Sequence, residues 1–379
     1  MIEASDGLEG VIAAHTVLSE VDGEAGRLVI RGLSLSELAG VRSYEWTARR
    51  LWDGFFEALP EDLTGPLGQA RLEVWSEVAA LDGPLARRET LEIVRALLAR
   101  LADGEDLATA LRLLAAPAVF TAAAIRARRG EAAVAPDPRL SQAADFLRML
   151  HGAPANPAQV DALEAYLVTV IDHGLNASTF AARVAASTRA GLTSAAIAGL
   201  CALKGPLHGG APGPVIEMLD AIGTPDNARP WLEGALARGE RLMGFGHRIY
   251  RVRDPRADAL KAAVRRLMRA QNTPGGRLHL AEAVEDAALA ILAERKPDRS
   301  LATNVEFYTA LLLGGLGLPA EAFTCLFAAG RMAGWIAHAR EQVLTGRLIR
   351  PQSLYVGPAL ERVAFGRSPP GASQRAQGL

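Results

Sequence analysis

Two glycine-rich stretches, KGPLHGGAPG at Lys204–Gly213 and MGFGHRIYRVRDPRA at Met243–Ala257, decide how this chain is interpreted. Each places one histidine, His208 or His247, among glycines, where a backbone can approach a ligand closely and leave the imidazole uncovered. A single histidine beside glycine is weak evidence, because most such residues are ordinary loop histidines. Two of them, followed by the DPR sequence that ends in Arg256, are a much rarer combination. Together they predict the core of an active site.

Further motifs lie on both sides of these stretches, in the order GLEGVIAAHTVLSEVDGEAGRLVIRG from Gly7, DHGLNASTFAARVAAST from Asp172, TNVEFY from Thr303 and GRMAGWIAHAREQ from Gly330. With GPLHGG and GFGHR, they make the sequence resemble the citrate synthase family, which includes the 2-methylcitrate synthases. The resemblance extends over nearly the whole chain. It implies an acyltransferase of the citrate synthase type.

Length and composition agree with a soluble enzyme. The 379 residues allow two domains and ample buried core, and 50% hydrophobic with 22% charged residues is ordinary for a globular protein. The net charge of −1 predicts no nucleic-acid partner. No charged-then-apolar leader opens the chain and no apolar run reaches the length of a membrane span, so we expect a cytoplasmic protein without a membrane partner. Cys201 and Cys325 lie in apolar runs without metal-ligand spacing, which predicts two buried thiols and no metal site.

Residue periodicity predicts a mainly α, or all-α, fold with one small β-hairpin near the N-terminus. The hairpin strands are expected at 15–20 and 27–31, around Asp22 and Gly23. After Gly32 the apolar spacing becomes helical, and Ser34 and Ser43 are suitable N-caps. The main helices are expected at residues 67–81, 89–101, 107–128, 141–150, 157–188 with a break near 173, 192–203, 215–222, 229–238, 257–271, 280–294, 301–313 and 320–344.

The resemblance also implies a division into two helical domains. Residues 1–208 with 313–379 would form the large domain, and residues 209–312 would form a small domain inserted in it. Residues 366–379 lack apolar periodicity, which predicts a disordered tail.

The reaction that the resemblance implies joins acetyl-CoA to oxaloacetate. A base must remove a proton from a methyl group beside a thioester carbonyl, and donors must stabilise the charge that develops on two oxygens. In the family's pattern, His208 donates to the thioester oxygen and His247 to the ketone oxygen. Glu306 stands where the family has its catalytic aspartate. The alternative for each histidine taken singly is a loop residue satisfied by backbone groups.

Oxaloacetate is a dianion, so its site needs fixed positive charge, and arginine binds carboxylates through two parallel hydrogen bonds. The motif match assigns Arg256, Arg331 and His173 to substrate binding within one chain. Arg350, in RLIRP, matches an arginine that the family supplies from the partner subunit. The resemblance therefore implies a homodimer with active sites shared between subunits. Without the motifs, any one of these arginines is more simply a surface residue.

Gly244 and Gly246 resemble the loop whose backbone meets the adenine of CoA in this family. The GxG spacing alone is weak, because a tight turn before a helix has the same spacing. The family match implies acetyl-CoA as co-substrate, and no permanently bound cofactor is expected.

The chain departs from the family's pattern at three places. Glu306 replaces the aspartate of NVDFY, and Pro212-Gly213 replaces the usual Asn-Glu after PLHGGA. ETLEIVRA from Glu89 is a poor match to HPMDVLRT. Three hypotheses therefore stay open: a citrate synthase, a 2-methylcitrate synthase that takes propionyl-CoA, and a diverged, weakly active or inactive paralogue with a binding or regulatory role.

Overall fold

A computed structural model describes residues 6–8, 10–209, 212–246, 249–270, 276–296 and 301–358. The chain divides into two units, residues 14–349 and residues 1–13 with 350–379. In the second unit, residues 350–358 form neither helix nor strand. The predicted tail at 366–379 lies outside the described residues. The sheet and all the described α-helices lie within residues 14–349.

The N-terminal sheet has three antiparallel strands in the order β1-β2-β3, which are Ser19–Asp22, Arg27–Ile30 and Leu33–Ser34. Leu28 and Ile30 alternate toward the core, as the period of a half-buried strand requires. The predicted hairpin is confirmed, but its first strand begins at Ser19 instead of residue 15. The third strand was missed because it is only two residues long and runs directly into a helix.

Helices make up most of the described chain. In order they are α1 Leu35–Leu38, α2 Tyr44–Trp52, α3 Thr64–Trp75, α4 Gly83–Ala86, α5 Thr90–Leu98, α6 Leu107–Arg128, α7 Gln142–His151, α8 Pro157–Thr169, α9 Ala177–Ser187, α10 Leu192–Leu203, α11 Pro212–Ile222, α12 Ala228–Ala237, α13 Pro255–Ala270, α14 Gly276–Arg295, α15 Val305–Gly315 and α16 Phe323–Thr345. Short 3-10 turns lie at Asp6–Leu8, Ser76–Ala80, Pro225–Asn227 and Ala320–Ala322.

Capping side chains explain several of the helix starts. The Ser43 Oγ accepts a hydrogen bond from the backbone N–H of Trp46, and Ser34 forms a capping box with Glu37, as predicted from the sequence. The predicted helix at 301–313 begins four residues late, at Val305. Asn304 is its N-cap, and Thr303 pairs with Phe245 in an isolated β-bridge.

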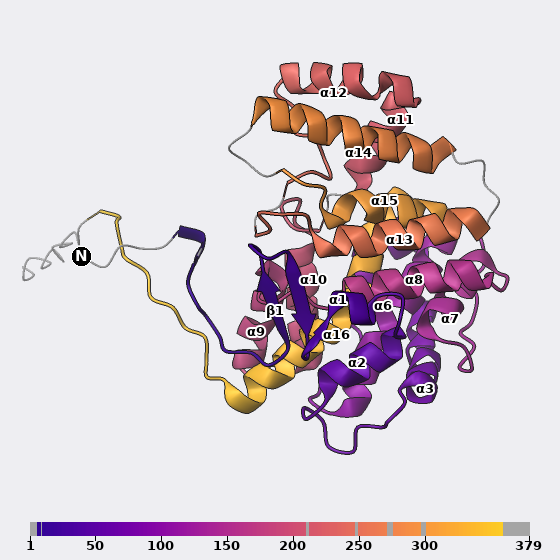
Figure 1. Cartoon of the computed structure of the whole chain (residues 1–379). Coiled ribbons are helices and arrows are strands. Elements are labelled where there is room, and N and C mark those ends of the chain that lie inside the picture. Colours follow the sequence, from indigo (N-terminus) through magenta and orange to yellow (C-terminus); the bar gives the residue numbers. More distant parts are fainter. Residues whose placement is uncertain are drawn as a thin grey trace, which may run out of the picture. The chain divides into compact units, whose positions relative to one another are not determined.

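Two long helices, α6 and α16, form the centre of the core (Figure 1). Helix α6 packs on α3, α5, α7 and α16, and nearly every side chain of α16 is buried. By length and composition α6 could cross a membrane, which corrects the expectation from sequence that no run is long enough. However, 83% of its apolar window is buried by other helices, as in a core helix. Cys325 of α16 is buried as predicted, whereas Cys201 is exposed on α10.

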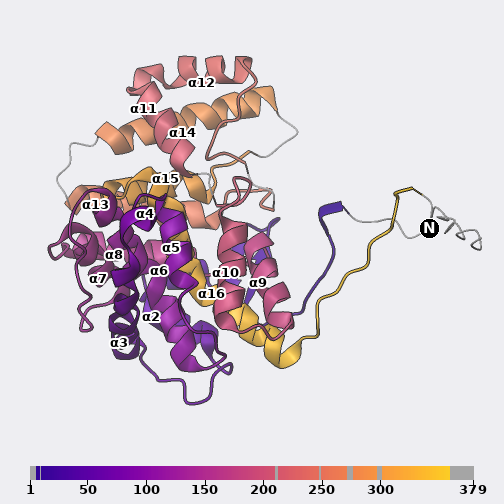
Figure 2. The same cartoon turned by 180° about the vertical axis from the view of Figure 1, so that it is seen from behind.

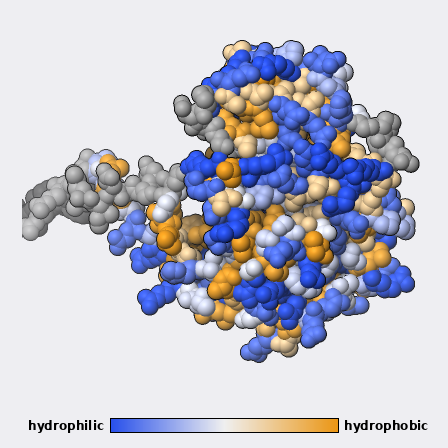
Figure 3. Space-filling view, viewed as in Figure 1, coloured by the Kyte–Doolittle hydropathy of each residue, from blue (hydrophilic) through white to orange (hydrophobic). Residues whose placement is uncertain are grey.

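Helices α11, α12 and α14 stand together at one end of this unit, beside α13 and α15, in both views (Figures 1 and 2). Helix α13 turns Leu260, Val264 and Leu267 inward, and hydrophilic residues cover much of the face on which it lies (Figure 3). These helices fall within the predicted inserted domain. The division at residues 209–312 stays a prediction, because the unit at 14–349 is compact throughout.

Helix α16 approaches the loop after α8 through glycines. A β-carbon at Gly334 would lie 2.4 Å from the carbonyl oxygen of Ile171, and one at Gly330 would lie 2.4 Å from the Val170 side chain. The loop from Val170 to His173 therefore rests directly on the helix backbone.

We expect Gly334→Ala to lower the free energy of unfolding by about 1–3 kcal/mol, because the added methyl group would force this loop away from α16. Urea unfolding measures the change. Gly65→Ala in α3 is the matched control, because a β-carbon there would meet no described atom within 4 Å. Equal stability of the two variants would show that the loop yields without cost.

Candidate active site

Glu306 lies in the first turn of α15 and faces an unusual environment for a carboxyl group. Its Oε2 atom is buried, and no described residue gives its side chain a hydrogen bond. Burial raises the pKa of Glu306 to about 7, although the charges of Arg256 and Arg331 act in the opposite direction. A carboxyl group with a pKa near neutrality is suited to general acid–base work.

Arg256, at the start of α13, is held in place by Asp254. The arginine Nε donates to Asp254 Oδ1 at 3.1 Å and its Nη2 donates to Oδ2 at 2.9 Å, and both side chains are nearly fully buried. Asp254 Oδ2 also accepts the backbone N–H of Val305 at 3.2 Å. One carboxylate therefore positions the guanidinium of Arg256 and the start of the helix that carries Glu306.

Arg331 brings a second positive charge from the middle of α16 and is 1% exposed. Its Nε donates to the carbonyl oxygen of Val170 at 2.7 Å, and its Nη1 and Nη2 make no hydrogen bond to a described residue. Burial lowers the pKa of Arg331 to about 10, while Asp172 and Glu306 partly restore it. A buried guanidinium with its two terminal nitrogens unused is a suitable receptor for a carboxylate.

His208 lies in the turn after α10 and contacts the start of α9. The backbone N–H of Ser178 points to its Nε2 at 3.3 Å, and the Ser178 Oγ lies 2.8 Å from the same nitrogen. Because a backbone N–H can only donate, Nε2 accepts, which assigns the ring proton to Nδ1. Burial, together with the charges of Arg331 and Arg256, lowers the pKa of His208 to about 4. The imidazole is therefore neutral at physiological pH.

His173 lies in the loop between α8 and α9 and is buried. Its Nε2 is 3.1 Å from the hydroxyl of Tyr250, and the two rings meet edge to face. The Tyr250 ring in turn lies 5.9 Å from the guanidinium carbon of Arg256. His173 is thereby connected to the same site from the opposite side.

Gly244 and Gly246 lie in the loop before α13, both at positive φ, a backbone conformation that favours glycine. Gly244 O accepts the N–H of Asn304, Gly246 N donates to Ala302 O, and the Asn304 amide donates to Gly246 O. These bonds fasten the glycine loop to the segment before α15. A pocket of about 570 Å³ opens beside Gly246, and Arg241, Arg295 and Lys296 are among its lining residues.

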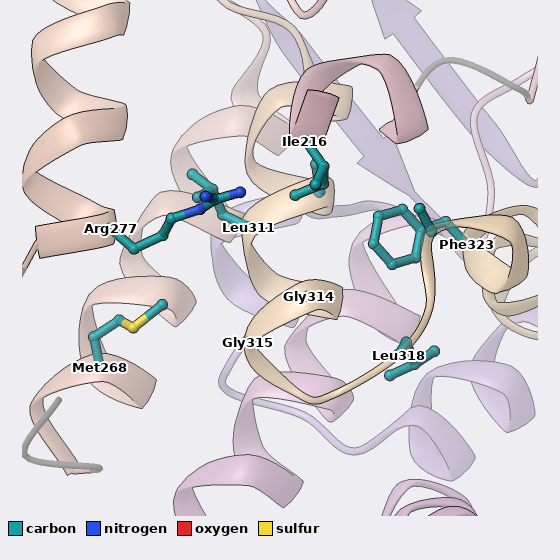
Figure 4. Close-up of a pocket in the computed structure, with 10 residues that line it drawn as sticks. Ile216, Met268, Arg277, Leu311, Gly314, Gly315, Leu318 and Phe323 are labelled. Atoms are coloured by element: carbon teal, nitrogen blue, oxygen red, sulfur yellow. The ribbon is translucent and has the colours of Figure 1, made fainter. Parts of the chain in front are cut away.

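A second pocket, of about 310 Å³, lies at the far end of α15 from Glu306 (Figure 4). Its lining is mostly apolar, with Ile216, Leu311 and Phe323 on its walls and Arg277 as its one charged residue. None of the predicted site residues lines it, so we do not assign it to the reaction.

Comparison with known proteins identifies the family of the chain. A model of the citrate synthase C-terminal domain matches residues 7–352. The chain is 40% identical over 364 residues to a putative citrate synthase 2 of Mycobacterium tuberculosis, covering 93% of this chain and 92% of that protein.

The chain belongs to the citrate synthase family.

Other relatives agree with this assignment. The 2-methylcitrate synthase of M. tuberculosis is 35% identical over 364 residues, covering 93% of this chain and 90% of that protein. The structure matches the citrate synthase of Thermoplasma acidophilum, solved in complex with carboxymethyl coenzyme A and oxaloacetate, with a TM-score of 0.82 and 29% identity over 96% of this chain and 98% of that one. The resemblance, the mainly helical fold and the enzyme type predicted from sequence are confirmed: the chain is a citrate synthase-type acyltransferase.

The structure brings five of the predicted site residues together. Glu306, Arg256, Arg331 and His208 influence one another's charge, and His173 joins them through Tyr250. His247 lies outside the described residues. Arg350 belongs to the other unit, so its part in the site stays a prediction, as do the roles of all the residues named.

Sequence analysis missed three residues of the site. Asp254 and Ser178 lie inside motifs that were identified in the sequence, but functional roles were assigned only to neighbouring residues of those motifs. Tyr166 of α8 is fully buried, its hydroxyl has no hydrogen-bond partner among the described residues, and its pKa is raised by burial and by the charge of Glu306. It stands in the apolar run YLVTV, which is typical of core, so only the structure could single it out.

We expect Glu306→Gln to stabilise the protein at alkaline pH. Because the pKa of Glu306 is raised in the folded state, its ionisation does not reduce the free energy of unfolding below pH 4.5, the ordinary pKa. The reduction grows as the pH rises from 4.5 to about 7. The variant should therefore gain on the order of 1–3 kcal/mol over the parent at pH 8 and almost nothing at pH 4.5.

Denaturant unfolding at both pH values measures this difference. Glu217→Gln, exposed on α11, should show no gain that depends on pH. Parallel pH dependence of parent and Glu306→Gln would contradict a buried carboxyl without a partner.

Proposed function

We propose that the chain condenses acetyl-CoA with oxaloacetate to give citrate and CoA. The observation that supports this most is the Glu306 carboxyl, whose Oε2 is buried without a hydrogen-bond partner among the described residues and which feels the charges of Arg256 and Arg331. An unpaired buried carboxyl lowers stability, so its presence is understandable where a substrate needs it as a base.

In this proposal the ionised Glu306 removes a proton from the methyl group of acetyl-CoA. Its pKa of about 7 leaves a useful fraction ionised at neutral pH, while the base remains strong enough to act on a weak carbon acid. The neutral His208 donates its Nδ1 proton to the thioester oxygen, where negative charge develops. A neutral imidazole is suited to this role, because it still carries the Nδ1 proton that it donates to the oxygen of the enol.

The two carboxylates of oxaloacetate meet the arginines. Arg331 offers its terminal nitrogens, and Arg256 is oriented by Asp254. By motif match, His173 and His247 complete the binding of the 2-oxoacid, and His247 donates to the ketone under attack. The enol carbon then forms a bond to the ketone carbon, while the enol proton returns to His208 and His247 protonates the ketone oxygen. Water then hydrolyses the thioester and releases the CoA thiol.

The acyl-CoA is a co-substrate, and the pocket beside Gly246 suits the nucleotide end of CoA, which lies away from the acyl group. Arg241, Arg295 and Lys296 offer positive charge for phosphate groups, and the backbone at Gly246 is free of a side chain. Glu240 also lines the pocket, and the three basic residues outnumber it, which leaves a net positive charge suited to the phosphates of a nucleotide.

The acyl group itself is the open part of the proposal, because the relatives include a 2-methylcitrate synthase. Propionyl-CoA differs from acetyl-CoA by one methylene, which a hydrophobic pocket distinguishes by only about 1–3 kcal/mol. A diverged paralogue remains the alternative from another class, because Glu306 is one methylene longer than the family's aspartate.

We expect thiol release from acetyl-CoA only when oxaloacetate is present, at a rate about tenfold or more above that with propionyl-CoA. Glu306→Gln should lower turnover by about 10²–10⁴-fold, because a general base contributes that much. A thiol reagent follows the reaction. Faster turnover of propionyl-CoA would assign the chain to the 2-methylcitrate synthases, and no oxaloacetate-dependent release would favour the inactive paralogue.

Glu306→Asp separates an adapted site from a damaged one. If the site is built around the longer side chain, the aspartate falls about 1 Å short and the rate drops on the order of a hundredfold. If the site is a damaged ancestral one, the aspartate raises the rate.

We also propose that the enzyme is a homodimer in which Arg350 enters the partner's site. The unit that contains Arg350 supports this, because Leu354, Tyr355, Val356 and Ile12 are all strongly exposed in the single chain. Exposed apolar side chains on a segment without secondary structure are typical of an arm that is buried on a partner.

Mixing Arg350→Ala subunits with Glu306→Gln subunits tests the shared site. Each mixed dimer holds one site with both residues intact, so random exchange should restore about a quarter of the parent activity. Native mass spectrometry verifies the exchange. If mixed dimers form and stay inactive, Arg350 acts within its own chain.

A further inference from the structure

Glu285 of α14 is a buried carboxylate outside the set of residues assigned to the reaction. Four donors surround it. Its Oε2 accepts from Lys261 Nζ at 2.7 Å and from the Tyr308 hydroxyl at 2.5 Å, and its Oε1 accepts from the Thr303 hydroxyl at 2.7 Å and pairs with Arg253 Nη1 at 3.0 Å. A carboxylate has about four acceptor positions, so Glu285 is fully satisfied.

This arrangement holds the residue ionised in the interior. Burial alone would raise the pKa of Glu285, but the bonds from Lys261, Tyr308 and Thr303 and the charge of Arg253 lower it below its ordinary value. A buried ion pair contributes little net stability compared with apolar residues of the same shape. The cluster is therefore better explained by the geometry that it imposes than by stability.

Two of the four donors bracket the base. Thr303 lies three residues before Glu306, and Tyr308 lies two residues after it. The first turn of α15 is thus attached to one carboxylate at both ends. Thr303 also pairs with Phe245, so the glycine loop is attached at the same point.

The other donors come from the side of the substrate. Arg253 immediately precedes Asp254, the residue that orients Arg256, and Lys261 lies two turns further along α13. Glu285 therefore reaches both segments that meet at the candidate site, the one that holds the 2-oxoacid and the one that holds the base.

We propose that Glu285 is a positioning residue for the condensation. It acts through Thr303 and Tyr308 to hold the Glu306 carboxyl at the distance from the acyl methyl group that its longer side chain requires. Through Arg253 it keeps that base in register with Arg256. The inference rests on the proposed function in taking Glu306 as the base.

The competing explanation is that Glu285 only joins α13, α14 and α15. Thr303 distinguishes the two, because Thr303→Val keeps the shape of the side chain and removes a single hydrogen bond, while the other three donors to Glu285 stay in place. A positioning role predicts that this variant lowers kcat about tenfold or more and leaves the KM for oxaloacetate nearly unchanged. Thr303→Ser keeps the hydroxyl and should retain most of the parent rate.

Glu285→Gln should do more, because it removes the charge that all four donors share. We expect a fall in kcat of about a hundredfold and a higher KM for oxaloacetate, since Arg253 and Arg256 are released as well. In both variants the apparent pKa of the rising limb of kcat/KM against pH should move. The matched control is Glu282→Gln, one turn away on α14, whose carboxylate pairs with Arg265 of α13 at 2.6 Å on the solvent side.

The experiment measures kcat, both KM values, the pH profile and thermal unfolding for the parent and these four variants. Loss of kcat and a shifted pH limb in Thr303→Val, with recovery in Thr303→Ser and no change in Glu282→Gln, supports the proposal. Losses of kcat that merely follow the folded fraction, with the pH limb unchanged, overturn the proposal, and so does a parent-like Thr303→Val.

A measurement that does not depend on activity tests the positioning role separately from the proposed function. If the parent releases no thiol from either acyl-CoA, the function is wrong, and amide hydrogen exchange at residues 304–307 then tests the positioning. Exchange about tenfold faster in Thr303→Val than in Thr303→Ser supports it, and equal exchange in the two variants overturns it.

Discussion

The carboxylate of Asp254 is the connection on which the candidate site depends. It accepts hydrogen bonds from the backbone and the guanidinium of Arg256 and from the backbone N–H of Val305, so the start of α13 and the start of α15 meet at one side chain. Each helix alone would leave its first N–H groups without partners. Sharing an acidic group satisfies α15 at its positive end, and the same group aims a guanidinium at the substrate space.

Around this carboxylate, some buried charged groups have hydrogen-bond partners and others have few. Asp172 Oδ2 accepts from the Ser19 hydroxyl and lies 3.3 Å from His338 Nε2. Arg183 donates through its Nε to Gln342 and through its Nη1 to Glu341 and His338. By contrast, no described residue donates a hydrogen bond to Glu306 Oε2, and none accepts one from the terminal nitrogens of Arg331. An unpaired buried charge lowers the stability of the folded protein. The paired network must therefore keep the surrounding helices in place when no dianion is bound.

Much of this fold was predictable from sequence because periodicity and capping act locally. The bounds of α6 and α10 were predicted to the residue, and Ser43 and Ser34 cap helices as expected. The start of α15 was not, since the β-bridge between Thr303 and Phe245 is a tertiary contact across almost sixty residues. Site residues were found where a motif singled them out. Tyr166 and Glu285 were not identified, because a tyrosine in an apolar run and a glutamate on a helix are common in any protein. Only their tertiary contacts distinguish them.

The late start of α15 also bears on the length of the base. Had the helix begun at residue 301, Glu306 would stand a full turn inside it and its side chain would lean back over the preceding turn. With Asn304 as N-cap, Glu306 instead lies in the first turn, where the N–H groups at the positive end of the helix favour its ionised form. The charges of Arg256 and Arg331 oppose the effects of burial and of Asp254 on the pKa of Glu306. The pKa of Glu306 near 7 is thus a balance, and a side chain of different length would change both its reach and that balance.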